Sequence, residues 1–183
     1  MKPDISTADP PSPEYCLTLI DRYRMLPNIR AHSLKVRDVS LIIADAVQRA
    51  GGHMDRALVE AGALLHDITK TRSISTRENH AQTGQALLTE LGFPKTGRVV
   101  GEHIIPDDRG DRLTAAEIVA YADKRVLHDS VVELEERFVY LKKRYGDFPR
   151  ALEYYAKMRA RMLHIEDIVA AIIKRPFQAL ELF

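Results

Sequence analysis

Histidine and aspartate residues stand at inward-facing positions in several stretches of this chain. In the segment 57–70, apolar residues at helical spacing, among them Val59 and Ala63, lead directly to His66 and Asp67. A buried, unpaired aspartate is costly, so Asp67 needs a partner, and a divalent metal ion is the strongest one available. Histidine beside aspartate is a weak signal alone, so the prediction depends on whether other nitrogen and oxygen ligands converge on this pair.

Four more such residues lie on apolar faces of expected helices, three or four positions from the apolar residues of their stripe. They are His32, His80, His103 and Asp123. A single inward histidine is usually a hydrogen-bonded core residue, and a single inward aspartate is usually a cap or an ion-pair partner. Four histidines and two aspartates are hard to satisfy with one another in a small helical domain. Neutral imidazole and carboxylate together are a common ligand set for divalent metals.

The other three histidines serve as an internal comparison, because none of them heads a clear apolar stripe. His53 follows a pair of glycines, His128 lies on a mixed face, and His164 lies near an expected irregularity of the last helix. We therefore predict structural or surface roles for these three side chains.

The elements that must position the candidate ligands are predicted to be helical. Helices are expected over about residues 13–26, 28–50, 55–70, 80–91, from 94 onward, from 114 through Leu127, in the charged segment that follows to 145, and over 150–174. Residues 71–79 and 106–112 are polar and irregular and indicate loops, and no alternating strand pattern of useful length is present. The sequence predicts an all-α fold with about seven helices.

Capping residues support several of these boundaries. Asn28 and Asp55 can each cap the helix that follows. Thr114 and Glu117 have the spacing of a capping box, in which each side chain bonds to the backbone of the other residue.

Composition places the chain among ordinary globular proteins. Its 183 residues fit one domain, and the formal net charge of +1 gives no general case for nucleic-acid binding. No apolar run approaches the roughly 20 residues of a membrane span. Residues 1–12 lack the apolar core of a signal peptide and are expected to be a flexible lead-in. The single Cys16 excludes an internal disulfide and fits a reducing compartment, so we expect a cytoplasmic protein.

The order His32, His66-Asp67, Asp123 resembles the HD superfamily of metal-dependent phosphohydrolases. The letters HDITK, which begin at His66, are similar to the HDIGK-type segment of that superfamily, with Thr where Gly is common. The letters YADK around Asp123 are similar to its closing segment. The resemblance covers about residues 28–128 and implies an all-helical bundle with a metal at its centre.

Residue by residue, the resemblance implies two metal sites. One metal would be held by His32, His66, Asp67 and Asp123. Asp67 would also bridge to a second metal held by His80 and His103, which are similar to the two extra histidines of the binuclear branch. Glu102 stands before His103 where some binuclear members have a second histidine. Such ligands favour Fe or Mn and also admit Zn, Ni, Co or Mg.

Two cations about 3.5–4 Å apart can bridge a hydroxide and clamp a phosphate group. We therefore hypothesise in-line hydrolysis of a phosphoester or phosphoanhydride bond in a nucleotide or related small phosphorylated metabolite. Asp67 and Lys70 are the expected catalytic residues. Lys70 could hold a phosphate or stabilise developing charge, although a solvated lysine at a helix end is an equally good interpretation.

Four arginines are candidates for phosphate contacts, because the guanidinium group suits bidentate binding. Arg72 and Arg77 flank the loop between two ligand segments, and Arg109 and Arg112 lie in the turn after His103. Each alone is typical of a surface residue, and we predict that at least one lines the substrate pocket together with Lys70.

The chain beyond the resembling part is expected to be a helical extension, residues 129–183, of a single domain spanning 13–183. Its Tyr154, Tyr155, Met158 and Met162 form a stripe that is typical of a core or a dimer contact, rather than of a surface for base stacking. A homodimer therefore remains an option.

Other functions stay open at this point. One is a mononuclear nucleotidase in which His80 and His103 line the substrate pocket. Another is a metal-bound helical module that binds a nucleotide or a protein with little catalysis. A redox reaction at a di-iron site, as in some oxygenase relatives of the superfamily, is a further, less favoured alternative.

Overall fold

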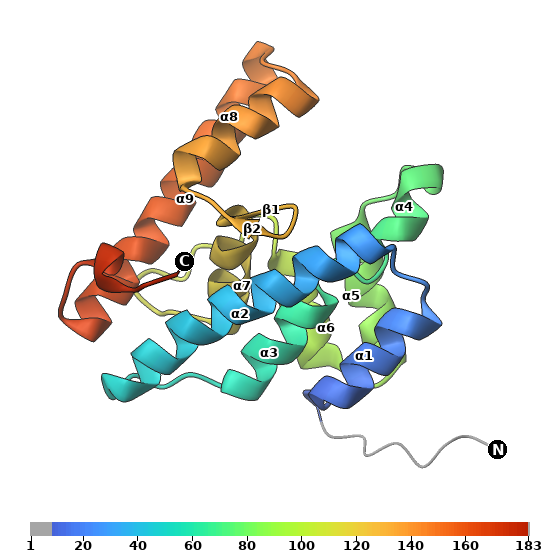
Figure 1. The fold of residues 1–183 in the computed structure, drawn as a ribbon, viewed down its shortest axis with the longest axis horizontal. Coiled ribbons are helices and arrows are strands. Elements are labelled where there is room, and N and C mark those ends of the chain that lie inside the picture. The colour runs from blue at the N-terminus through green and yellow to red at the C-terminus, as the bar shows by residue number, and fades with distance from the viewer. Residues whose placement is uncertain (1–8, 183) are drawn as a thin grey trace.

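The computed structural model of the protein describes residues 9–182, and nearly all regular structure in this range is helical (Figure 1). Its α-helices are α1 (Pro13–Arg22), α2 (Pro27–Arg49), α3 (Arg56–Leu65), α4 (Lys70–Thr76), α5 (His80–Glu90), α6 (Pro94–Glu102), α7 (Ala115–Lys124), α8 (Leu134–Tyr145) and α9 (Pro149–Ile173). A short antiparallel hairpin, β1 (Val126–Leu127) with β2 (Ser130–Val131), and a 3₁₀ turn, η1 (Phe177–Ala179), complete the described part. The predicted all-α class is confirmed.

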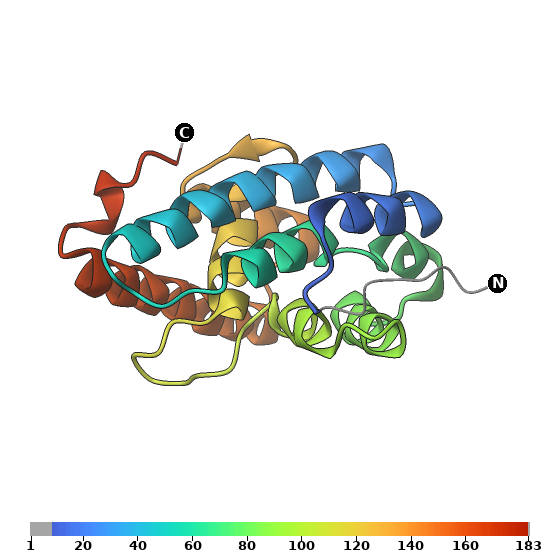
Figure 2. The ribbon, with the colours of Figure 1, turned by 90° about the horizontal axis from the view of Figure 1, so that it is seen from below.

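The second half of helix α3 lies inside the molecule. Its residues from Ala61 to Leu65 are buried, because α3 packs against α1, α2, α6 and α7. In Figure 2, α2 and α1 lie on one side of α3, and α5 and α6 lie on the other. A Cβ atom at Gly62 would overlap Val99, so this glycine lets α3 and α6 approach closely. Burial of the second half explains why the sequence there is apolar at successive positions.

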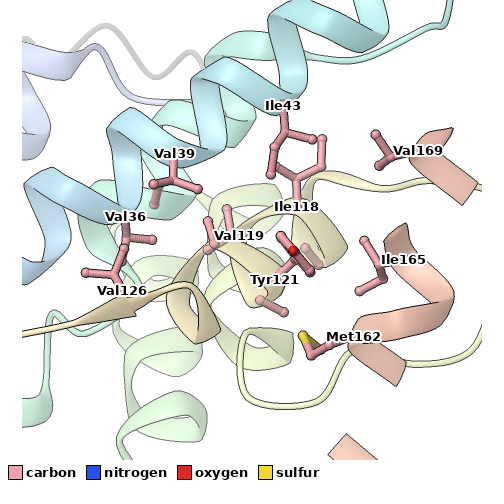
Figure 3. Close-up of a cluster of buried hydrophobic side chains, with 14 of the residues drawn as sticks. Val36, Val39, Ile43, Ile118, Val119, Tyr121, Val126, Met162, Ile165 and Val169 are labelled. Carbon is pink, nitrogen blue, oxygen red and sulfur yellow. The ribbon is translucent and has the colours of Figure 1, made fainter. Parts of the chain in front are cut away.

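The main core joins α2, α7 and α9. Figure 3 shows Val36 and Ile43 of α2 and Ile118 of α7 in one cluster with Ile165 and Val169 of α9, and all five are buried. The C-terminal helix α9 therefore shares a core with the helices that carry the candidate ligands.

The prediction of a loop over residues 71–79 is wrong for most of this segment, because residues 70–76 form helix α4. This helix buries none of its residues, so it lacks the apolar stripe by which a helix is found in a sequence. Ile74, for example, is 63% exposed. Thr71 fixes the helix to the start of α2, since its hydroxyl accepts a hydrogen bond from the backbone N–H of Leu26.

The prediction that the helix beginning at residue 114 includes Val126 and Leu127 is wrong, because these two residues form strand β1. Helix α7 ends at Lys124, and the β1–β2 hairpin reverses the chain before α8 begins. His128 lies in the turn with a left-handed backbone (φ 58°). The side chain of Arg125 donates to the carbonyl of Val132 at 2.6 Å, which ties the two ends of the hairpin together. A single contact between residues seven positions apart produces no periodic pattern in the sequence, so the hairpin could not be predicted.

The capping predictions have mixed outcomes. Asp55 caps α3 by accepting a hydrogen bond from the N–H of Leu58, and the capping box of Thr114 and Glu117 is present. Asn28 is not a cap, because α2 begins one residue earlier at Pro27, whose fixed φ suits the first helical position. The last helix is continuous through His164.

The expected flexible lead-in, residues 1–12, falls mostly outside the described residues. Its last four residues are described and make defined contacts. The carboxylate of Asp9 accepts hydrogen bonds from the backbone N–H groups of Lys95 and Thr96 at the start of α6. Ser12 caps α1 by accepting from the N–H of Tyr15. Among residues 9–182, no helix combines the length and the apolar character that crossing a membrane requires.

Candidate metal centre

The six residues predicted as metal ligands meet in one place and form two clusters. Within each cluster, one ligand atom from every residue lies within 4.8 Å of the others. The inner cluster consists of His32, His66 and Asp123, which are all buried. The outer cluster consists of Asp67, His80 and His103, of which His80 is half-buried. Residues from α2, α5 and α7 and from the segments after α3 and α6 thus converge, as predicted.

Asp67 lies between the two clusters. Its Oδ2 atom is 3.4 Å from Nε2 of His66, while its Oδ1 atom is 3.3 Å from Nε2 of His80 and 3.8 Å from Nε2 of His103. One oxygen of the carboxylate therefore faces each cluster. This is the placement that a bridging ligand needs.

His66 and His103 are oriented by the same local device. Each directly follows the last residue of its helix, α3 or α6. The Nδ1 atom of His66 lies 2.8 Å from the carbonyl oxygen of Ala63, and that of His103 lies 2.6 Å from the carbonyl oxygen of Val100. These carbonyls belong to the last helical turn, where no further N–H of the helix is available. Because a carbonyl only accepts, Nδ1 carries a proton, and in the neutral ring Nε2 has the lone pair that a metal needs.

His32 is oriented by the β1–β2 hairpin. Its Nδ1 atom lies 2.8 Å from the carbonyl oxygen of His128, so Nδ1 donates, and its Nε2 atom lies 2.9 Å from Oδ1 of Asp123. The side chains of His53 and His128 are exposed and that of His164 is half-buried, and all three lie outside the two clusters. His128 thus orients His32 through its backbone carbonyl, and no pattern in the sequence indicates this contact.

Two atoms of the clusters are left without a partner in the described part of the protein. Nε2 of His66 and Oδ1 of Asp67 are buried and have no hydrogen bond. Buried polar atoms are nearly always paired, so both atoms point to a partner of another kind. A cation in each cluster would satisfy them, and the imidazole and carboxylate donors fit a divalent metal.

Comparison with known proteins decides the family. Residues 29–126 match the model of the HD domain, which is more than half of the chain. The chain belongs to the HD-domain family. An uncharacterized protein of Methanocaldococcus jannaschii is 28% identical over 134 residues, which are 65% of this chain and 78% of that protein.

Among solved structures, a predicted HD superfamily hydrolase from an uncultured Thermotogales bacterium is similar over 88% of this chain and 91% of that one. The TM-score is 0.48 and the identity is 17%. The resemblance seen in the sequence is thus confirmed at the level of the family. HD domains bind divalent metals, and the two clusters of this HD domain could hold them.

The two carboxylates of the HD domain are strongly acidic. Burial acts to raise the pKa of Asp67, but the neighbouring His66 and Lys70 outweigh it and hold this pKa well below its usual range. Burial likewise opposes ionisation of Asp123, but the Lys124 ammonium group, together with His32 and His66 beside the carboxylate, holds its pKa well below the usual range. Both side chains are therefore anionic ligands at neutral pH.

The imidazole of His103 is neutral. Burial lowers the pKa of His103 to about 3, and repulsion from His66 acts in the same direction. A neutral imidazole can bind a metal without first losing a proton.

Each aspartate has its own lysine. Nζ of Lys70 donates to Oδ2 of Asp67 at 2.8 Å, and Nζ of Lys124 donates to Oδ2 of Asp123 at 2.5 Å. Arg137 of α8 also reaches this region, with one guanidinium nitrogen 3.9 Å from Oδ1 of Asp123. Sequence reasoning missed Lys124, although it follows Asp123 directly. It also missed Arg137, because only the hairpin turns α8 back toward the HD domain.

A cavity of about 770 Å³ opens at the outer cluster. Its floor is formed by residues of both clusters and their cationic neighbours, namely Lys70, His80, His103, Asp123, Lys124 and Arg137. Its opposite wall comes from α8, α9 and the turn between them. Of the five residues predicted to bind substrate, Lys70 lines this cavity.

The four predicted arginines do not line it. Arg109 is held by Glu102 through two hydrogen bonds of 2.7 and 2.8 Å, and both Arg109 and Arg112 border a different cavity. Arg72 pairs with Glu78 on the exposed side of α4, and Arg77 is exposed at its end. None of the four arginines lines the cavity at the two clusters, so the structure does not agree with the prediction that at least one lies in a pocket with Lys70. The reason is that sequence proximity to a ligand does not fix the direction in which a loop side chain points.

Proposed function

We propose that this HD domain hydrolyses a phosphoester or phosphoanhydride bond in a nucleotide or related small phosphorylated metabolite. The observation that carries the proposal is the position of Asp67. Its two oxygens face different ligand clusters at the floor of a cavity lined by cationic side chains. Membership of the HD family supports a metal-dependent hydrolase, and the bond and the substrate class are our inference from the site.

In this proposal the inner cluster holds one divalent ion and the outer cluster holds a second, with Asp67 shared between them. Bound divalent cations lower the pKa of water and neutralise charge on phosphoryl oxygens. The chain itself fixes the ligand geometry in advance. His32, His66 and His103 are each aimed by a hydrogen bond from Nδ1 to a backbone carbonyl. Such supporting bonds fix the ring orientation and increase ligand basicity.

Lys70 is the proposed phosphate-binding residue of the chain. It lines the cavity, its side chain is 38% exposed, and Asp67 positions its ammonium group. Burial acts to lower the pKa of Lys70, but Asp67 and Asp123 outweigh this and raise it, so the side chain stays protonated. A fixed positive charge beside the reacting phosphoryl group stabilises the charge that develops on its oxygens.

A mononuclear nucleotidase is the second candidate. Nε2 of His80 and Nε2 of His103 are 3.3 Å apart and can share a hydrogen bond without a metal. The two histidines would then line the substrate pocket beside a single ion in the inner cluster. A metal-bound helical module with little catalysis also remains to be separated from both enzymes.

Hydrolysis by the Mn²⁺- or Fe²⁺-loaded protein tests the proposal. The substrates are a phosphomonoester, a phosphodiester and a phosphoanhydride of the same nucleoside, and the readout is the product formed from each. We expect turnover of at least one, lost in Asp67→Asn and retained in Asp38→Asn, which changes an exposed aspartate of α2. A protein that binds metal but turns over none of the three would contradict the proposed hydrolysis and favour the binding module.

A further inference from the structure

The C-terminal helical hairpin, formed by α8 and α9, faces the metal centre across the cavity. α8 lies along α9, and the turn between them projects away from the rest of the helices (Figure 1). Both helices lie beyond residues 29–126, the part that matches the HD domain. This wall of the cavity is therefore built by a segment outside the family match.

Three aromatic side chains of this hairpin are unusually exposed. Tyr145 is 62% exposed, Phe148 is 57% exposed and Tyr154 is 45% exposed. They come from the end of α8, the turn and the first turns of α9, and all three line the cavity. Large aromatic side chains normally bury most of their surface, so a group of exposed ones at a cavity points to a ligand that covers them.

The hairpin holds the ring of Tyr154 in place through a buried neighbour. The ring of Tyr155 packs edge-on against that of Tyr154, with centroids 6.3 Å apart. The hydroxyl of Tyr155 donates to the carbonyl of Leu141 at 3.4 Å, which links α9 to α8. Tyr155, Met158 and Met162 are buried, as predicted for a core stripe, whereas Tyr154 departs from that prediction because it is 45% exposed.

The charged side chains that line the cavity indicate how a ligand would be oriented in it. The floor carries Lys70, Lys124 and Arg137 next to the ligand clusters, so an anionic group belongs at that end. The exposed rings are on the wall contributed by the hairpin, where a planar apolar group can stack on them. Arg150, Glu153 and Lys157 also line the cavity on this wall, so these three side chains together add one positive charge.

We propose that the α8–α9 hairpin selects the substrate, with Tyr145, Phe148 and Tyr154 stacking on a planar ring whose phosphoryl group lies at the metal centre. This inference rests on the proposed function and deepens it, because it assigns the ring-binding subsite to residues beyond the HD match. A nucleotide has the required chemistry, since every nucleobase offers a π face and base–aromatic stacking tolerates different bases.

Binding to the Mn²⁺-loaded protein separates the ring from the phosphate. AMP and ribose 5-phosphate share a phosphomonoester and differ in the base, and phenyl phosphate and cyclohexyl phosphate differ in the planarity of the ring. Isothermal titration calorimetry measures the affinity for each of the four ligands. We expect AMP to bind roughly tenfold more tightly than ribose 5-phosphate, and phenyl phosphate more tightly than its cyclohexyl counterpart.

Substitutions on the hairpin assign this preference to the wall. Tyr154→Leu and Phe148→Ala should each remove most of the AMP preference while leaving ribose 5-phosphate binding unchanged, and Tyr154→Phe should retain it. Leu152→Ala is the matched control, because Leu152 is exposed on α9 but does not line the cavity. All these side chains are at least 38% exposed, so the variants should fold, and their melting temperatures check this.

Failure of the ring-binding wall and failure of the proposed hydrolysis would give different results. Equal binding of AMP and ribose 5-phosphate, tighter binding of cyclohexyl phosphate, or a preference that survives both Tyr154→Leu and Phe148→Ala would overturn the ring-binding wall. A change of oligomeric state in these variants at unchanged ligand affinity would overturn it too, in favour of an interface between copies. The proposed function fails differently: no phosphate would then bind more tightly with metal than without it, and none would be hydrolysed.

Discussion

The inner and outer clusters use similar ligands but differ in how firmly the protein holds them. His32, His66 and Asp123 are 8%, 0% and 6% exposed, and the two histidines are both aimed by backbone carbonyls. In the outer cluster, His80 borders the cavity, and its side chain is 22% exposed. All three residues of the inner cluster are thus buried, whereas the outer cluster combines two buried residues, Asp67 and His103, with one half-buried histidine, His80, at the cavity.

The difference follows from where the chain places each ligand. His66 closes the buried helix α3, and Asp123 lies near the end of α7, which is buried along its whole length. His80 is the first residue of α5, a helix that follows the exposed α4 and the three residues after it. We therefore expect tighter metal binding at the inner cluster and easier exchange at the outer one, because a preformed site needs less reorganisation.

Removing the shared ligand should have the largest effect, since Asp67 faces both clusters. Asp67→Ala is expected to weaken metal binding at both and to reduce hydrolysis by more than about 100-fold, which is the upper range for changes that only support a ligand. Metal analysis and steady-state kinetics measure this, with Asp38→Ala as the control. Full retention of metal in Asp67→Ala would show that the carboxylate does not bridge the clusters.

The next largest effect separates the clusters. His80→Ala should reduce the metal content from about two ions per chain to about one, and a chelator should remove the outer ion first from the wild type. His66→Ala should empty the inner cluster and also destabilise the metal-free protein by about 1–3 kcal/mol, because the buried carbonyl of Ala63 loses its donor.

His53→Ala changes an exposed histidine and serves as the control for both variants. One ion per chain in both the wild type and His80→Ala would favour the mononuclear nucleotidase.

The two lysines offer a third, smaller contrast. In the metal-free protein, Lys124→Met should lower the free energy of unfolding by about 3 kcal/mol, because Lys124 is buried and its removal leaves Asp123 under-compensated. Lys70→Met should cost less than about 1 kcal/mol, since its side chain is more than a third exposed and solvent screens the pair. Chemical denaturation measures both. For substrate affinity the order should reverse, with the larger loss in Lys70→Met, and equal effects on both quantities would remove the distinction.

The six residues of the two clusters could be selected from the sequence because each lies on an apolar stripe or at its end. His32 lies one helical turn before Val36, and Asp123 one turn after Val119, so burial of the stripe forces these polar side chains inward. The all-α class followed from the same periodicity. Single-residue capping signals were less reliable, as the different outcomes at Asn28 and Asp55 show.

What could not be predicted depends on contacts between distant segments. The β1–β2 hairpin is too short to have a pattern, yet its carbonyl at His128 aims His32 from 96 residues away. The sequence around Arg137 indicates an ordinary surface helix, and that around Tyr154 indicates a core helix. Both residues reach the cavity only because the β1–β2 hairpin reverses the chain before α8. The same limit explains why the arginines chosen for their proximity in sequence point elsewhere.

The smallest expected effect is a difference in proton release when the two clusters bind metal. In the inner cluster, burial opposes protonation of His66, but the adjacent Asp67 and Asp123 carboxylates outweigh it and raise the pKa of His66 above its usual value. A cation must displace that proton, so inner-cluster affinity should rise with pH up to the raised pKa, by at most tenfold per pH unit, and then level off. In the outer cluster, His103 has a pKa of about 3 and holds no proton to release at neutral pH.

Calorimetry in two buffers that differ in ionisation enthalpy measures the protons released per metal. His80→Ala isolates the inner cluster, and the difference from the wild type gives the outer one. Release from the inner cluster should exceed that from the outer cluster near pH 6.5 and should disappear well above the raised pKa of His66. Release from the inner cluster that is the same near pH 6.5 as well above the raised pKa of His66 would mean that the two carboxylates do not hold a proton on His66, and would weaken the contrast between a preformed inner site and an adjustable outer one.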